Sequence, residues 1–351
     1  MMLTLARERA AAPSIAPEFA LAFDSRIAAE LRATGVPVHL LGAVRARNPL
    51  SVLRARRRLA SLLVARPYGA VACHMPWAHA LFAPVVRRAG VPDIFWMHTA
   101  ATGHGWQERC AARTVPDLAI CNSHFTAAMA PVLFPATAAA VLYCPVAIPA
   151  SRRGGAEALA LRDRLGAARD AVVIVQVGRM EALKGHAPLL RALATLRDRN
   201  WLCWQVGDAQ RPQETAYVDG LKRIAAELGI GARVQFLGHR NDVARVLEAA
   251  DIYCQPNIAP DAFGISYIEA LGARLPVVAT AIGGALEIVD ETCGVLVAPH
   301  DVEGLAAALA RLINDADARL TLGAAGPARA ATLCDPAAIL QRMERLLDAL
   351  N

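Results

Sequence analysis

Residues 171–185 read AVVIVQVGRMEALKG, and this stretch decides which fold to expect. Its first seven residues are almost all apolar and rich in valine, which indicates a buried β-strand. Arg179 and Lys184 follow, five positions apart, in a short loop before a helical stretch. Such a loop suits a diphosphate, because Arg binds phosphate oxygens bidentately and Lys adds a point charge. Taken alone, the segment is also compatible with a solvated helix start.

The same alternation of short β-type runs and Ala/Leu-rich helical stretches continues along all 351 residues. It predicts an α/β fold with two Rossmann-like domains, 1–150 and 151–335, each with a parallel sheet. Ligands of such folds bind outside the carboxyl ends of the strands. The strands are expected at 36–41, 70–73, 93–97, 117–121, 139–143, 171–177, 201–206, 233–237, 251–255, 276–280 and 295–297. A helix is expected over 19–33 with no strand before it, and 147–170 should be a linker that runs into a helix.

A second segment, PDAFGISYIEALG at 260–272, follows the strand expected at 251–255. Its glycine lets the backbone approach a ligand, and the helix that opens near Ile265 offers free N–H groups to phosphate. Glu269 lies about one turn into this helix, within reach of ribose hydroxyls. The alternative is local: Asp261 could be a helix cap, and Glu269 could merely favour its own helix N-terminus.

Together these segments resemble the GRxxxxKG and acidic-x7-Glu motifs of glycosyltransferase family 4, the retaining, group 1 glycosyl transferases with the GT-B fold. The resemblance extends over about 170–330. It includes the stretches at 236–239 (FLGH), 250–253 (ADIY) and 275–289 (LPVVATAIGGALEIV). The strand at 93–97, followed by His98, is similar to the family strand whose terminal histidine reaches the donor sugar.

The resemblance implies a role for each motif residue. Arg179 and Lys184 would hold the donor diphosphate and steady the leaving group, and Asp261 and His98 would contact the sugar. The other expected donor-binding residues are Gly178, Gly238, His239, Phe263, Gly264, Ile265, Glu269 and Glu287. Fixed positive groups would stand in for a divalent metal, so neither a metal nor another cofactor is expected. The family usually has Glu where this chain has Asp261, which is one methylene shorter and puts the type and placement of the donor sugar in question.

The resemblance also implies a function, a metal-independent hexosyl transfer with retention from a nucleotide sugar, either UDP- or GDP-linked, to an acceptor hydroxyl. The acceptor would be a glycan or lipid-linked molecule of polysaccharide or glycolipid synthesis, and the last helix, 336–351, would return to the first domain. A non-catalytic nucleotide-sugar binder is the alternative, because no strand and Gly-rich loop precede the first expected helix. A dinucleotide dehydrogenase is disfavoured, because no GxGxxG unit follows a strand. A GT-B epimerase or phosphorylase fits the paired motifs less well.

Charge is distributed unevenly along the chain. Residues 1–150 contain 15 Arg, no Lys and 7 acidic residues, although the whole chain has a net charge of only +6. A basic first half suits an anionic partner, although a bias toward Arg codons would give the same composition. The basic amphipathic stretch at 50–64 could lie on anionic lipid, or it could be a surface helix with a solvated Arg face. No nucleic-acid partner is expected. With no apolar run of 18 residues and a charged N-terminal stretch, the chain is expected in the cytoplasm, with the inner face of the membrane as a second option.

Overall fold

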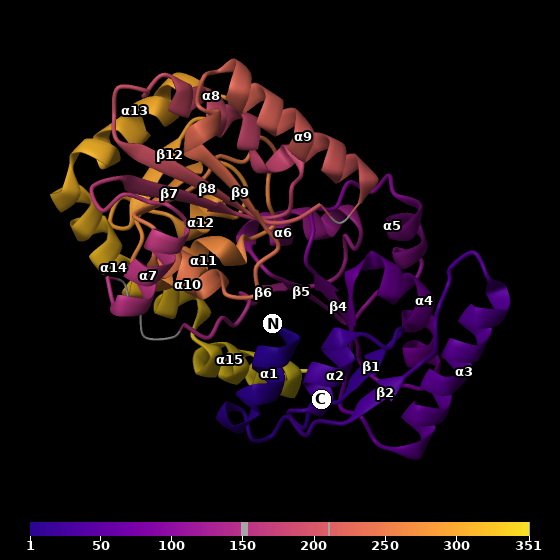
Figure 1. Ribbon diagram of the computed structural model, residues 1–351. Helices are drawn as coiled ribbons and strands as arrows, with labels where there is room; N and C mark the ends of the chain where they lie inside the picture. The colour runs from indigo at the N-terminus through magenta and orange to yellow at the C-terminus, as the bar shows by residue number, and fades with distance from the viewer. Residues whose placement is uncertain (149–153, 210, 351) are drawn as a thin grey trace. The chain divides into compact units, whose positions relative to one another are not determined.

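The computed structural model describes residues 1–148, 154–209 and 211–350. The chain divides into two compact units, shown in Figure 1. Unit 1 consists of Met1–Ala147 together with Cys334–Asn351, and unit 2 consists of Ile148–Leu333. Part of the linker predicted at 147–170 falls on residues 149–153, which lie outside the described residues.

Unit 2 is built on a six-stranded parallel sheet of order β12-β11-β10-β7-β8-β9. Its strands are β7 (Val172–Val177), β8 (Trp201–Val206), β9 (Val234–Gly238), β10 (Ile252–Gln255), β11 (Val277–Thr280) and β12 (Gly294–Val297). Its helices are α7 (Ala156–Arg164), α8 (His186–Ala194), α9 (Pro212–Glu227), α10 (Val243–Glu248), α11 (Ile265–Gly272), α12 (Ala285–Ile288), α13 (Val302–Asn314) and α14 (Ala316–Cys334). This topology places the chain reversal between β7 and β10, where α/β sheets bind ligands at the carboxyl ends of their strands.

Helices cover both faces of this sheet (Figure 1). On one face α8, α9 and α13 share one buried cluster with the strands, to which Ile174 of β7, Leu190 of α8 and Leu309 of α13 belong. The central strands β7, β8, β10 and β11 are buried along nearly their whole length. This explains why their sequences are continuous apolar runs rather than alternating patterns.

Unit 1 contains a four-stranded parallel sheet of order β3-β4-β5-β6 and a separate parallel pair, β1-β2. The strands are β1 (Phe19–Leu21), β2 (Val38–Leu40), β3 (Val71–His74), β4 (Asp93–Met97), β5 (Leu118–Cys121) and β6 (Ala139–Val141). The helices are α1 (Met2–Arg7), α2 (Arg26–Arg32), α3 (Pro49–Ala65), α4 (Met75–Arg88), α5 (Trp106–Ala111), α6 (His124–Met129) and α15 (Pro336–Asp348).

The last helix, α15, is part of the core of unit 1. Ile339, Leu340 and Met343 on this helix are buried in one cluster with Ile94 and Ile120 of the sheet. Asp335 caps the helix by accepting a hydrogen bond from Ala338 N at 2.9 Å, and Pro336 occupies its first position. Both features are ordinary helix start signals.

The α/β class and the two Rossmann-like parallel-sheet units confirm the predicted fold, and each expected strand is present within two residues of its predicted ends. The helix predicted over 19–33 is wrong for its first seven residues, 19–25. Phe19–Leu21 form strand β1, which pairs with β2 from Phe19↔Val38 to Leu21↔Leu40, and helix α2 starts only at Arg26. Pairing with a strand 19 residues away overrides the helical preference of the Ala- and Leu-rich sequence.

Candidate functional site

The cation-bearing loop of unit 2 connects β7 to α8 and is fixed by a close backbone approach. Its 3-10 turn, Ala182–Lys184, ends at Gly185, which has a φ of +73°. A Cβ atom at Gly185 would lie only 1.7 Å from the carbonyl oxygen of Pro256, just after β10. Ile258 N also donates to the carbonyl of Leu183 at 2.9 Å. Glycine is therefore required where this loop meets the chain that leads to Asp261.

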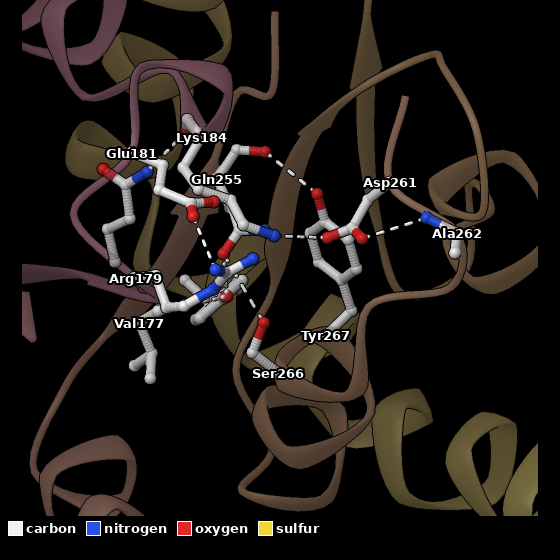
Figure 2. A network of polar contacts seen from close by, with 11 residues as sticks. Val177, Arg179, Glu181, Lys184, Gln255, Asp261, Ala262, Ser266 and Tyr267 are labelled. Atoms are coloured by element: carbon white, nitrogen blue, oxygen red, sulfur yellow. Dashed lines mark hydrogen bonds and ion pairs between the residues drawn. The ribbon is translucent and has the colours of Figure 1, made fainter. Parts of the chain in front are cut away.

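Both cations of the loop are held by carboxylates, as Figure 2 shows. The ammonium of Lys184 forms an ion pair with Oδ2 of Asp261, and the two side chains are only 14% and 24% exposed. Arg179 Nη1 lies 2.5 Å from Glu181 Oε1, and about half of the Arg179 side chain is exposed (52%). The structure thus brings Lys184 and Asp261, from the two motif segments, into direct contact.

The loop of Asp261 is positioned by the glycine pair at 283–284. Gly284 N donates to the carbonyl of Asp261 at 2.9 Å, and a Cβ atom at Gly283 would lie 2.4 Å from that same oxygen. Asp261 Oδ1 accepts a hydrogen bond from Ala262 N at 2.9 Å. The carboxylate therefore has one oxygen on the backbone and one on Lys184, which fixes its orientation.

Two buried polar side chains, those of Gln176 and Tyr267, tie these loops to the sheet, and these contacts were not predicted from the sequence. Gln176 Nε2 donates to the carbonyl of Lys184 at 2.7 Å, and Tyr267 OH donates to the carbonyl of Gln255 at 3.1 Å. Burial raises the pKa of Tyr267 far above its usual range, so its hydroxyl keeps the proton that it donates. The sequence did contain a signal for such contacts, because β7 and β10 each have a glutamine at or next to their last residue. A buried glutamine needs a hydrogen-bond partner.

Helix α11 opens directly after this loop. Gly264 is its N-cap, with a φ of +106°, and a Cβ atom there would lie 2.4 Å from the ring of Tyr267. Phe263 is buried, whereas the side chains of Ile265 and Glu269 are exposed. The first N–H groups of α11 and the carboxylate of Glu269 thus belong to one short segment that begins at Asp261.

On the side of β7 where β8 and β9 lie, the strand ends approach each other at Gly207, a glycine that the sequence did not single out. Gly207 N donates to the carbonyl of Gly238 at 3.0 Å, and a Cβ atom at Gly207 would lie 1.8 Å from the carbonyl oxygen of Gly178. The predicted residues Gly178 and Gly238 therefore lie along one edge, and His239 is exposed beside them. Glu287 is half-buried in α12, which follows Gly284.

Among the predicted site residues, only His98 belongs to unit 1. It follows β4, and its Nε2 lies 2.8 Å from Nδ1 of His74, which ends β3. Burial lowers the pKa of His98 to about 4. At neutral pH its imidazole is therefore uncharged, and it can donate or accept one hydrogen bond at each nitrogen according to its tautomer.

The described residues contain neither a metal-binding cluster nor a membrane-spanning helix. Within 1–148, 154–209 and 211–350, no group of three or more His, Cys, Asp or Glu side chains is placed to hold a metal ion. No helix in the same ranges is long and apolar enough to span a membrane.

Comparisons with known proteins point to one family. Residues 159–329 match the family model "Glycosyl transferases group 1". The D-inositol 3-phosphate glycosyltransferase of Corynebacterium kroppenstedtii is 37% identical over 172 residues, 46% of this chain and 37% of the relative. That of Mycolicibacterium paratuberculosis is 38% identical over 179 residues, 49% of this chain and 39% of the relative. The chain thus matches less than half the length of these curated relatives.

Solved structures match over nearly the whole chain. HepE of Anabaena, solved with UDP-glucose, has a TM-score of 0.85 and 25% identity, and the match covers 99% of this chain and 94% of HepE. WaaG, a glycosyltransferase involved in lipopolysaccharide biosynthesis, has a TM-score of 0.71 at 18% identity, with 99% and 95% covered. With the motifs at 178–185 and 261–269, these matches place residues 159–329 in the group 1 glycosyl transferases and show that the chain has the GT-B fold.

Proposed function

We propose that the chain is a retaining glycosyltransferase that moves a hexosyl group from a nucleotide sugar to an acceptor hydroxyl without a metal ion. The observation that carries this proposal is the contact between Lys184 and Asp261, since it joins the two motif segments at the carboxyl ends of β7 and β10. A UDP-sugar is the proposed donor, because HepE, whose structures contain UDP and UDP-glucose, is similar over 94% of its length.

The proposed chemistry uses the charges of unit 2. As the bond between the sugar and the diphosphate breaks, negative charge grows on the leaving diphosphate. Lys184 and Arg179 would stabilise this charge, and they are already oriented by Asp261 and Glu181 before the diphosphate arrives. Once Lys184 contacts phosphate, Asp261 would be released from it to accept hydrogen bonds from sugar hydroxyls. Gly238, His239, Glu269 and Glu287 are the proposed contacts to the nucleoside and the sugar.

One of the two arguments for the non-catalytic alternative no longer holds. This alternative rested on a missing strand and a missing Gly-rich loop before the first helix, but strand β1 does precede α2. Residues 22–25 between them contain no glycine, so the connection differs from the family pattern.

The acceptor is proposed to be a glycan or a lipid-linked molecule, with helix α3 as a contact for anionic lipid at the cytoplasmic face of a membrane. Two arginines of α3 are used internally, because Arg56 donates to Leu81 O at 2.6 Å and Arg58 to Leu41 O at 3.2 Å. Arg54 and Arg57 are exposed and have no partner among the described residues, and Leu53 beside them is also exposed. Basic and apolar exposed side chains on one helix are typical of interfacial binding.

The test is transfer from UDP-glucose and other UDP-sugars in the presence of a chelator, with glycan and lipid-linked acceptors. The product's anomeric configuration is read by proton NMR. We expect transfer with retention in the wild type and a loss of about tenfold or more in Lys184→Met, which lacks the charged contact to phosphate. Tight binding of a UDP-sugar with no transfer to any acceptor would favour the non-catalytic alternative.

A further inference from the structure

The ends of β3 and β4 place two histidines of unit 1 side by side. His74 pairs in register with Trp96, and His98 lies two residues further along the chain. His74 Nδ1 and His98 Nε2 are 2.8 Å apart, and the two imidazole rings are within 6° of parallel. The ring of Trp96 stacks on both, with centroid distances of 4.9 Å to His74 and 5.9 Å to His98.

The backbone holds His74 in this position. His74 is the N-cap of α4, and the next residue, Met75, has a φ of +73° although it is not a glycine. This left-handed conformation costs about 1–2 kcal/mol for a residue with a Cβ. Such a conformation persists only where the surrounding structure determines it, and it is most frequent at functional sites. The strand-to-helix turn therefore fixes the direction in which His74 leaves the sheet.

The protonation of the two rings is linked. Burial, and then the neighbouring His98, lower the pKa of His74 to about 3, and burial lowers the pKa of His98 to about 4. Both rings are neutral at pH 7, so one nitrogen of the contact must donate and the other must accept. If His74 donates from Nδ1, His98 carries its own proton on Nδ1. If His98 donates from Nε2, its Nδ1 is an acceptor.

We propose that His74 is a positioning residue for His98: it occupies Nε2, leaves only Nδ1 for a hydroxyl of the sugar substrate, and sets whether that nitrogen donates or accepts. Within the described residues, neither His98 Nδ1 nor His74 Nε2 has another hydrogen-bond partner, and both side chains are partly exposed. The effect of this arrangement on transfer rests on the proposed function. Its effect on the tautomer of His98 does not.

The test compares substitutions at His74 in the full chain. His74→Phe keeps an aromatic ring to stack on Trp96 and removes the hydrogen bond. His74→Asn places an amide atom close to the position of Nδ1, whereas the longer His74→Gln reaches the position of Nε2. His104→Phe, at an exposed histidine of unit 1, is the matched control. The ¹⁵N NMR spectrum of histidine-labelled protein at pH 7 identifies the tautomer of each neutral imidazole, and the signals of His98 are assigned by their loss in His98→Phe.

We expect one dominant tautomer of His98 in the wild type and in His104→Phe, and a mixture of tautomers in His74→Phe. The kcat for transfer should fall about tenfold in His74→Phe with KM for the donor nearly unchanged, and His74→Asn should recover more of it than His74→Gln. An unchanged His98 tautomer in His74→Phe would overturn the proposal, whatever the kinetics. If the wild type transfers no sugar, the proposed function fails, while the NMR comparison still decides the role of His74.

Discussion

Replacing Gly185 by alanine tests whether the cation-bearing loop depends on its close approach to the chain after β10. Gly185 has a φ of +73°, and the added Cβ would lie 1.7 Å from Pro256 O and 2.6 Å from Pro256 C. Both are backbone atoms, so no side-chain rotation relieves the clash. The loop or residues 256–257 must move, and Lys184 and Asp261 would be separated.

The magnitude follows from three contributions. The left-handed backbone costs about 1–2 kcal/mol for alanine, and the smaller entropy of the unfolded chain offsets about 0.4–1 kcal/mol of it. Overpacking adds about 1–3 kcal/mol. We therefore expect Gly185→Ala to lower the free energy of unfolding by about 2–4 kcal/mol. Gly166→Ala is the matched control, because Gly166 has a φ of +66° but nothing within 4 Å of its added Cβ. Its expected loss is about 1 kcal/mol or less.

Urea denaturation of the three proteins measures this difference. Both glycines belong to unit 2, so both variants report on the unfolding of the same unit. Calorimetric titration with UDP then tests the consequence for the site, where Gly185→Ala should bind at least about tenfold more weakly and Gly166→Ala like the wild type. Equal losses of stability in the two variants, or wild-type UDP affinity in Gly185→Ala, would refute the reasoning.

Three further predictions concern single side chains. Asp261→Asn should leave UDP affinity unchanged or higher, because Lys184 loses its internal counter-ion. Transfer should nevertheless fall about tenfold or more. A loss of UDP affinity as large as the loss of transfer would contradict this prediction. Glu269→Gln should weaken UDP binding in calorimetry but leave the melting temperature unchanged, because this side chain is exposed; a lower melting temperature would instead indicate a structural role. Burial lowers the pKa of His186 from 6.5 to about 4. Between these pH values the unfolded chain binds a proton at this residue and the folded chain does not. The free energy of unfolding should therefore fall as the pH decreases from 6.5 to 4. His186→Gln should flatten this dependence by up to about 1.4 kcal/mol per pH unit in urea denaturation at pH 7, 6 and 5, and an unchanged slope would show that His186 does not titrate in this way.

The strands were predictable because their signal is local. Short apolar runs rich in β-branched residues, such as VVIVQV at 172–177, favour buried strands, and both donor motifs follow such runs. Strand β1 was missed because its three residues are strand only through their pairing with β2. The Ser25 that precedes α2 is a helix start signal that could have placed the helix correctly.

The site residues that the sequence did not single out make contacts that depend on how the strands and loops pack. Gln176 and Gly207 hold loops to strand ends, and the Gln255 side chain accepts a hydrogen bond from Tyr253 OH, contacts that a single sequence does not show. His74 was within reach of prediction, since it ends β3 and the carboxyl ends of neighbouring parallel strands lie at one edge of a sheet. The ion pairs of Arg179 and Lys184 depend on side-chain directions that the motif spacing leaves open.

The central claim, that unit 2 binds the diphosphate of a nucleotide sugar through Lys184, is tested most directly by calorimetric titration in the presence of EDTA. UDP and uridine are titrated into the wild type, Lys184→Met and Lys222→Met. Lys222 is the other lysine of the chain and lies exposed on α9, where it forms an ion pair with Asp219 at 3.6 Å. We predict that UDP binds the wild type and Lys222→Met equally, at least about tenfold more tightly than uridine, and that Lys184→Met loses this advantage. Equal affinities for UDP and uridine, or wild-type UDP affinity in Lys184→Met, would contradict the claim.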